Sequence, residues 1–186
     1  MQNYSVDQFK KLITDCKKPY VVLLVGLPLS GKDTFLAQLN SNDFLIISRD
    51  EILEKHNDKI SDYRSAFSKI DSKIVDKQFF SKINEHVFSK INCIINATNL
   101  TKKRRRKICL RFTDYYRIAL IMPLISESEF NRRNVVRYEK IGKKLPNSLY
   151  NEMTAVYEEV TEDEEFEKIS YLMQQQQNSQ IKDVVL

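Results

Sequence analysis

The stretch Gly26-Leu27-Pro28-Leu29-Ser30-Gly31-Lys32-Asp33-Thr34 follows directly on an apolar run, residues 21–25, and decides the fold. It has the spacing G-x-x-x-x-G-K and stands between a predicted strand and a predicted helix. In that setting backbone N–H groups converge on phosphate oxygens, and the positive end of the helix faces the same anion. Lys32 adds a charge that can bridge the β and γ phosphates. We therefore predict that residues 26–34 bind ATP.

The two residues after this lysine bear on metal binding. Asp33 stands where the usual pattern has Ser or Thr, and Thr34 follows it. Carboxylate and hydroxyl oxygens are ligands that Mg²⁺ accepts, so we predict a magnesium site at Asp33 and Thr34. The Gly-Lys-Asp-Thr step is similar to that of some nucleoside monophosphate kinases.

Runs of branched apolar residues alternate with amphipathic stretches along the chain. The predicted strands are residues 21–25, 44–47, 91–95 and 118–122, with a short fifth strand near residues 168–173. Residues 61–90 lack Gly and Pro and repeat apolar side chains at helical spacing, which predicts one long helix or two abutting helices. Strands that alternate with helices indicate βαβ units. We predict an α/β fold, a three-layer sandwich around a central parallel β-sheet.

Length and composition limit the other possibilities. The 186 residues suffice for one domain, which we place at residues 1–173, followed by a polar tail at residues 174–186. No apolar run approaches the roughly 20 residues of a membrane span, and the N-terminus does not have the pattern of a secretion signal. The cysteines Cys16, Cys93 and Cys109 lack metal-ligand spacing, which favours buried thiols in a reducing compartment. We expect a cytoplasmic protein without membrane contact or structural zinc.

A cation and a carboxylate follow the second predicted strand, at Arg49 and Asp50. The carboxyl ends of the strands form the ligand edge of an open parallel sheet. Phosphoryl transfer to a hydroxyl needs a carboxylate that takes the proton, and Asp50 is suitably placed for this task. Arg49 could clamp a phosphate of the acceptor or of ATP. The alternative is that Asp50 only caps a helix over residues 52–56.

The third predicted strand ends in Asn96-Ala97-Thr98-Asn99-Leu100, and the basic run Lys102-Lys103-Arg104-Arg105-Arg106-Lys107 follows with Thr101 as its predicted N-cap. Such a run is usually a solvated helix face. Because it begins at the carboxyl end of a strand, its first turn should face Asp50 and the phosphate loop. We therefore predict that it contacts a polynucleotide backbone.

These segments together carry a family resemblance. Gly26 to Lys32, then Ser48-Arg49-Asp50-Glu51-Ile52, then Asn96 to Leu100 with its trailing cations resemble the polynucleotide 5′-hydroxyl kinase family, typified by the kinase module of phage and bacterial end-healing enzymes. The resemblance covers residues 19–169. It implies an adenylate-kinase-like P-loop fold with a helical lid at about residues 126–146. It also implies transfer of the ATP γ-phosphate, with Mg²⁺, to a 5′-hydroxyl end of DNA or RNA.

The resemblance implies roles for individual residues. Lys32 stabilises the transferring phosphoryl group, Asp50 activates the 5′-hydroxyl, and either Arg133 or Arg137 is the lid arginine that neutralises charge. Acceptor contacts are implied for a further set: Arg49, Asn96, Thr98, Asn99, Lys102 and Lys103.

The chain also departs from the family pattern. The family often has an aspartate where this chain has Asn96 or Ala97, and an asparagine supplies hydrogen bonds but no charge. Two other functions therefore stay open: a small-molecule or nucleoside monophosphate kinase of the same fold, and a catalytically weak nucleotide-binding regulator.

Overall fold

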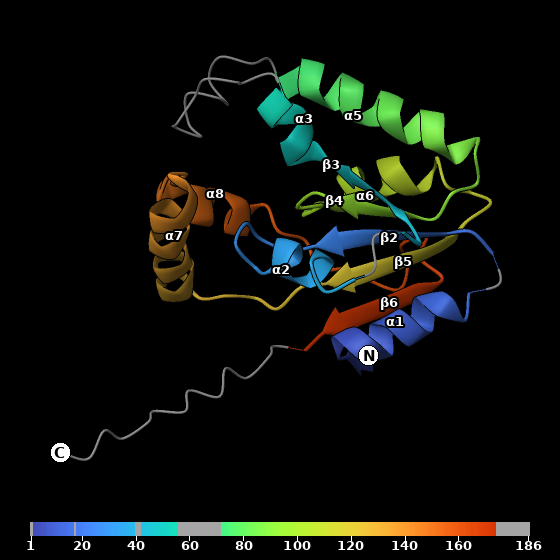
Figure 1. The fold of residues 1–186 in the computed structure, drawn as a ribbon, viewed down its shortest axis with the longest axis horizontal. Coiled ribbons are helices and arrows are strands. Elements are labelled where there is room, and N and C mark those ends of the chain that lie inside the picture. The colour runs from blue at the N-terminus through green and yellow to red at the C-terminus, as the bar shows by residue number, and fades with distance from the viewer. Residues whose placement is uncertain (1, 17, 40–41, 56–71, 174–186) are drawn as a thin grey trace.

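The structure, a computed structural model, describes residues 2–16, 18–39, 42–55 and 72–173 (Figure 1). The strands are β1 (Gln2–Tyr4), β2 (Tyr20–Val25), β3 (Leu45–Ser48), β4 (Cys93–Asn96), β5 (Tyr116–Ile121) and β6 (Lys168–Leu172). The helices are α1 (Val6–Thr14), α2 (Lys32–Leu36), α3 (Arg49–Lys55), α5 (Ser72–Val87), α6 (Lys102–Cys109), α7 (Glu127–Ile141) and α8 (Ser148–Ala155).

The strands form one parallel sheet in the order β1-β6-β5-β2-β4-β3. β2, which leads into the phosphate loop, lies between β5 and β4, and all of its residues are buried. Strands buried on both faces are typical of parallel sheets that helices cover on each side. The predicted α/β fold with a central parallel sheet is confirmed.

Helices cover the two faces of the sheet. On one face α3, α5 and α6 pack through Leu53, Phe79 and Ile108. On the other face α1 and α2 pack through Phe9 and Phe35, whose rings meet edge to face with centroids 5.4 Å apart. α7 and α8 stand beyond the arrowheads of β2, β5 and β6 (Figure 1). The carboxyl edge of the sheet, which holds the phosphate loop, therefore faces α7 and α8.

The five predicted strands are all present, with ends shifted by one or two residues, and β1 was not predicted. β1 has three residues, too few to show a period, and it pairs in parallel with β6 so that Tyr4 lies opposite Leu172. Within the predicted helical region 61–90, α5 is confirmed, whereas residues 56–71 lie outside the described part of the chain. The predicted tail at residues 174–186 also lies outside it.

Within the described ranges, no helix is both long and apolar enough to span a bilayer. Cys16, Cys93 and Cys109 are not joined in disulfides. The same ranges contain no cluster of three or more His, Cys, Asp or Glu side chains that could hold a metal.

Candidate active site

A cavity of about 1240 Å³ opens at the carboxyl edge of the sheet. Its walls come from the phosphate loop, α2, α3, the end of β4, α7 and α8. The polar and charged side chains that line it include Lys32, Asp33, Thr34, Arg49, Asp50, Asn96, Thr98, Glu129, Arg132, Arg133 and Arg137. The fold thus brings the predicted phosphate loop, base and lid arginines to one space.

Two glycines shape the phosphate loop. Gly31 has a φ of 101°, a left-handed conformation that side chains rarely adopt, and α2 begins at the next residue. At Gly26, an added Cβ would lie 2.7 Å from Cβ of Met122, just after β5. The loop therefore packs directly on the sheet edge, and neither glycine can be replaced without moving it.

The Lys32 ammonium folds back onto its own loop. Its Nζ donates to the carbonyl oxygens of Gly26 at 3.0 Å and Leu27 at 2.7 Å. Burial lowers the pKa of Lys32 to about 8, although the negative charges of Asp50 and Asp33 act in the opposite direction. The loop thus holds a partly desolvated cation whose field is strong because water screens it little.

Asp33 is tied to the third predicted strand. Its Oδ1 accepts a hydrogen bond from Asn96 Nδ2 at 3.0 Å, which joins the first turn of α2 to the end of β4. Asp33 and Thr34 are both exposed, and their carboxylate and hydroxyl are hard oxygen ligands. This donor set fits Mg²⁺. Asp33 departs from the usual phosphate-loop pattern and Asn96 departs from the family pattern, and these two residues contact each other.

Ser48, rather than Asp50, caps α3. The helix already begins at Arg49, and the Ser48 hydroxyl accepts the backbone N–H of Glu51 at 3.3 Å. The alternative in which Asp50 caps a helix over residues 52–56 is therefore wrong. Asp50 lies inside the first turn and lines the cavity, close enough to Lys32 for its charge to act on the pKa of that ammonium.

Arg49 is held by a residue that sequence reasoning missed. Its Nε donates to Asp76 Oδ1 of α5 at 2.9 Å, and Arg104 Nη1 of α6 donates to Asp76 Oδ2 at 3.0 Å. Hydrogen bonds and charges from Arg49 and Arg104 lower the pKa of Asp76 against the opposing effect of burial, which is the largest single contribution. Nothing in the local pattern around Asp76 distinguishes it from a solvated helix position, so no sequence signal could have found this contact.

Arg133 joins α7 to the phosphate loop. Its Nη1 donates to Leu29 O at 2.8 Å, and its Nε donates to Glu129 Oε1 at 2.6 Å. Arg132 donates to the same carboxylate, and the two arginines lower the pKa of Glu129 to about 2. Arg137 also lines the cavity, one turn further along α7. The structure therefore places Arg133 against the loop itself.

The predicted acceptor residues do not all reach the cavity. Asn96 and Thr98 line it, but among the described lining residues Asn99, Lys102 and Lys103 do not occur. Asn99 is 1% exposed, and its Nδ2 donates to Leu24 O at 2.8 Å. Lys102 pairs with Asp163 at 3.4 Å, whereas the side chain of Lys103 is exposed.

The residues of the basic run, 102–107, differ in how far they are buried. Thr101 caps α6 as predicted, accepting the Arg104 backbone N–H at 3.2 Å. Arg105 is fully buried, where it pairs with Glu164 at 2.6 Å and donates to four backbone carbonyl oxygens. This arginine ties the start of α6 to residues 158–164. Arg105 is thus a structural clamp. The sequence did not predict this role, because the other five residues of the run are also cations.

A strand, a glycine-rich loop and a helix at the carboxyl edge of a parallel sheet define a P-loop nucleotide-binding domain. Residues 21–160, about three quarters of the chain, match the AAA domain family designated AAA_33, and the chain belongs to this family. No protein of curated function matches the chain in sequence.

Solved structures share the fold at low sequence identity. A gluconokinase from Sinorhizobium meliloti 1021 matches with a TM-score of 0.56 and 16% identity, over 86% of each chain. Kti12 from Chaetomium thermophilum, in complex with ADP-AlF3, matches with a TM-score of 0.57 and 18% identity, over 86% of this chain and 91% of that one. A putative kinase from Chloroflexus aurantiacus j-10-fl matches with a TM-score of 0.56 and 14% identity, over 84% and 89% of the chains. This chain therefore has the fold of P-loop kinases.

Proposed function

We propose that this chain is an ATP-dependent polynucleotide 5′-hydroxyl kinase. The observation that carries the proposal is the shared cavity, in which the phosphate loop with Lys32 and the pair Arg49 and Asp50 line the same space. A donor site alone would serve any nucleotide-binding protein. A carboxylate and an arginine beside it supply a base and an anion contact for an acceptor that carries both a hydroxyl and a phosphate.

Asp50 takes the proton of the acceptor hydroxyl. The acceptor oxygen then attacks the γ-phosphorus, and the bond from that phosphorus to the β-phosphate oxygen breaks as ADP leaves. Lys32 moves from the carbonyl oxygens of Gly26 and Leu27 to the β and γ phosphates. Arg49 binds the phosphate on the 3′ side of the reacting nucleotide. Positioning and electrostatic stabilisation supply most of the acceleration in such transfers.

Asp33 and Thr34 hold magnesium in this proposal. The ion, when bound, neutralises charge on the donor phosphates and orients them. Asn96 keeps the Asp33 carboxylate turned toward the cavity by donating to one of its oxygens.

α7 and α8 form a lid over the donor, and Arg133 is its phosphate-binding arginine. Its guanidinium already contacts Leu29 of the loop, and the Glu129 carboxylate holds it in that position. An arginine fork suits an oxyanion better than a point charge does.

A small-molecule kinase of the same fold is the second candidate. Apolar side chains from α7, α8 and the segment between them line the same cavity, namely Val136, Leu145, Leu149 and Met153. Such a wall would suit a compact acceptor enclosed beside the nucleotide.

A transfer assay distinguishes the two candidate functions. The protein is incubated with labelled ATP, Mg²⁺ and either 5′-hydroxyl oligonucleotides or a panel of nucleoside monophosphates and sugars. Label on the 5′ ends of oligonucleotides is the expected result. Label only on small molecules would reject the polynucleotide assignment, and nucleotide binding without label on any acceptor would indicate a regulator.

A further inference from the structure

Three cations surround one aromatic ring at the seam between α5 and α6. Lys107 Nζ lies 4.2 Å from the ring centroid of Phe80, Arg111 Cζ lies 4.4 Å from it, and Arg104 Cζ lies 4.8 Å from it. Contact with the ring face favours each cation, but three like charges this close together repel one another. The Phe80 ring therefore holds the three cations in place, although the cations repel one another.

α5 supplies few counter-charges along this seam. Asp76 pairs with Arg104, and Asn84 Oδ1 accepts Arg111 Nε at 3.1 Å without neutralising it. Among the described residues, no carboxylate forms an ion pair with Lys107 or Arg111. Lys107 is exposed, and Arg104 and Arg111 are partly so. The seam thus presents preorganised positive charge that an anion can reach.

This seam is connected to the cavity. Asp76 bonds both to Arg104 and to Arg49, and Arg49 lines the cavity beside Asp50. Arg104 Cζ and Arg111 Cζ lie 4.8 Å and 4.4 Å from the same Phe80 centroid, so the two charged groups are at most about 9 Å apart. Consecutive phosphates of one strand are about 3.4 Å apart along B-DNA and farther apart when the strand is extended, so this length spans roughly two or three phosphates.

We propose that Arg104, Lys107 and Arg111, held on Phe80, form a track for the phosphate backbone of a single-stranded acceptor whose 5′ end lies at Asp50. The inference rests on the proposed function. Arg49 takes the first phosphate, and the strand then passes along α6 away from the cavity. A cluster of cations beyond Arg49 fits the further phosphates of a polynucleotide, whereas a small acceptor would reach only Arg49.

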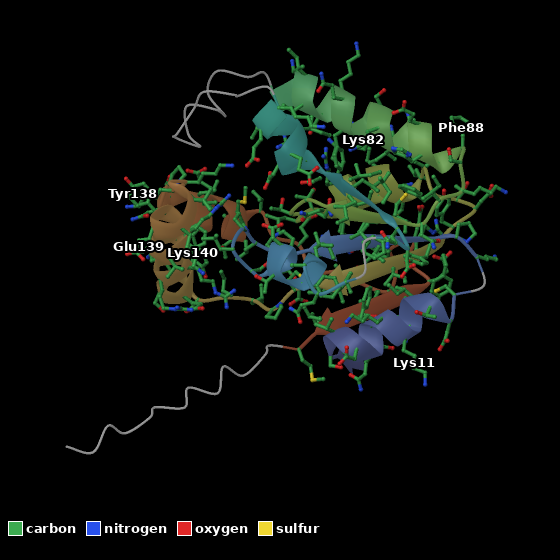
Figure 2. The ribbon with its side chains drawn as sticks, viewed as in Figure 1. Lys11, Lys82, Phe88, Tyr138, Glu139 and Lys140 are labelled. Atoms are coloured by element: carbon green, nitrogen blue, oxygen red, sulfur yellow. The ribbon has the colours of Figure 1, made fainter. Side chains whose placement is uncertain are left out.

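The test combines Lys107→Ala with Arg111→Ala in the full chain. Fluorescence anisotropy measures affinity for 5′-hydroxyl DNA and RNA oligomers of about 12 nucleotides, within the usual range of single-strand sites. We expect the double variant to bind the oligomer roughly tenfold more weakly. The slope of log binding constant against log salt concentration should become less steep by about 0.7 for each lost phosphate contact. Lys107→Arg with Arg111→Lys, which keeps both charges, should retain most of the affinity. Lys11→Ala, which removes an exposed charge on α1 (Figure 2), should have no effect.

Transfer kinetics distinguish this inference from the proposed function. With a dinucleotide acceptor the double variant and the wild type should have equal kcat/KM, while with the longer oligomer the variant's KM should rise. Equal kinetic constants for the double variant and the wild type on both acceptors would contradict the proposed track but not the kinase assignment. Equal affinity for a polyglutamate peptide, with the same loss in the variant, would overturn it in favour of an acidic protein partner. Absence of transfer to either acceptor by the wild type would reject the proposed function itself.

Discussion

Asn96 Nδ2 donates to Asp33 Oδ1 over 3.0 Å, and this bond joins residues 63 positions apart in the chain. Phosphate loops usually have Ser or Thr at position 33, and the kinase family that the sequence resembles often has an aspartate at or next to position 96. Here the carboxylate stands on α2 and the neutral donor stands at the end of β4. The pair still holds one acceptor and one donor, so the two departures compensate for each other and keep a carboxylate at the cavity.

The first prediction reverses this compensation. Asn96→Asp places a second carboxylate against Asp33, and the repulsion should cost on the order of 1 kcal/mol at this exposed site. Thermal melting in EDTA should show a lower Tm than the wild type, and Mg²⁺ should raise the Tm of the variant more than that of the wild type. Asn96→Ala, which only removes the hydrogen bond, serves as the control. Equal melting of Asn96→Asp and the wild type in EDTA would show that the pair is not coupled.

The second prediction concerns the base. Asp50→Asn should reduce transfer by about 10² to 10⁴-fold, because the amide cannot take the acceptor proton. Affinity for ATP should change little, since the loop and Lys32 stay in place. Stability should also be retained, because Ser48 caps the helix. Glu51→Gln, the next residue in α3 with the same charge change, is the matched control for kinetics and calorimetry. Persistent transfer in Asp50→Asn would remove Asp50 from the mechanism.

The third prediction is a conflict between stability and binding at Lys32. Burial lowers the pKa of this lysine to about 8 from its ordinary value of 10.5, so below pH 8 the folded state carries a poorly solvated charge. Lys32→Met should abolish nucleotide binding and stabilise the ligand-free protein on the order of 1–2 kcal/mol at pH 7.

The pH dependence of that gain has a definite sign. Between pH 8 and 10.5 the unfolded wild type binds more protons than the folded one, so wild-type stability rises with pH and the advantage of Lys32→Met shrinks. Denaturant titrations at pH 7 and pH 9.5 measure this, with Lys11→Met as an exposed control. A variant less stable than the wild type at pH 7 would mean that the carbonyl contacts of Gly26 and Leu27 outweigh the desolvation.

The fourth prediction separates Arg133 from Arg137, the two candidates for the arginine of the proposed lid. Arg133→Ala should lower kcat by at least about tenfold, because the Arg133 guanidinium donates to Leu29 O of the phosphate loop. Arg137→Ala should have the smaller effect on kcat. Steady-state kinetics on both variants, with Arg132→Ala as the control on the other side of Glu129, measure the difference. The reverse order would assign the lid role to Arg137.

The fifth prediction tests the buried clamp. Arg105→Met leaves the Glu164 carboxylate, which is 9% exposed, without its partner, and should lower the free energy of unfolding by about 3–5 kcal/mol. Arg106→Met, at the exposed neighbouring position, should stay within about 0.5 kcal/mol of the wild type. Urea unfolding measures both. Similar losses in the two variants would contradict the assignment of Arg105 as a clamp.

Much of the architecture follows from local chemistry. Buried parallel strands require runs of branched apolar residues, and these runs predicted β2, β3, β4, β5 and β6. β1 was not predicted, because three residues are too few to show a hydrophobic period and because its partner strand, β6, lies near the opposite end of the sequence. The predicted start of α3 with Asp50 as its cap, residue 52, is three residues late, because Ser48 and Asp50 are both residue types that cap helices and Ser48 is the one that accepts the Glu51 N–H.

The phosphate loop is what the sequence by itself determined, because its function depends on the backbone of consecutive residues, and glycine spacing encodes that backbone directly. Partners separated by long stretches of chain were decided only by the tertiary structure. Arg105 and Glu164 pair across 59 positions, and Arg49 meets Asp76 across 27. A cation in a basic run has the same local pattern whether it is solvated or buried. Packing of α5, α6 and residues 158–164 against the sheet selects which cations become clamps and which remain exposed.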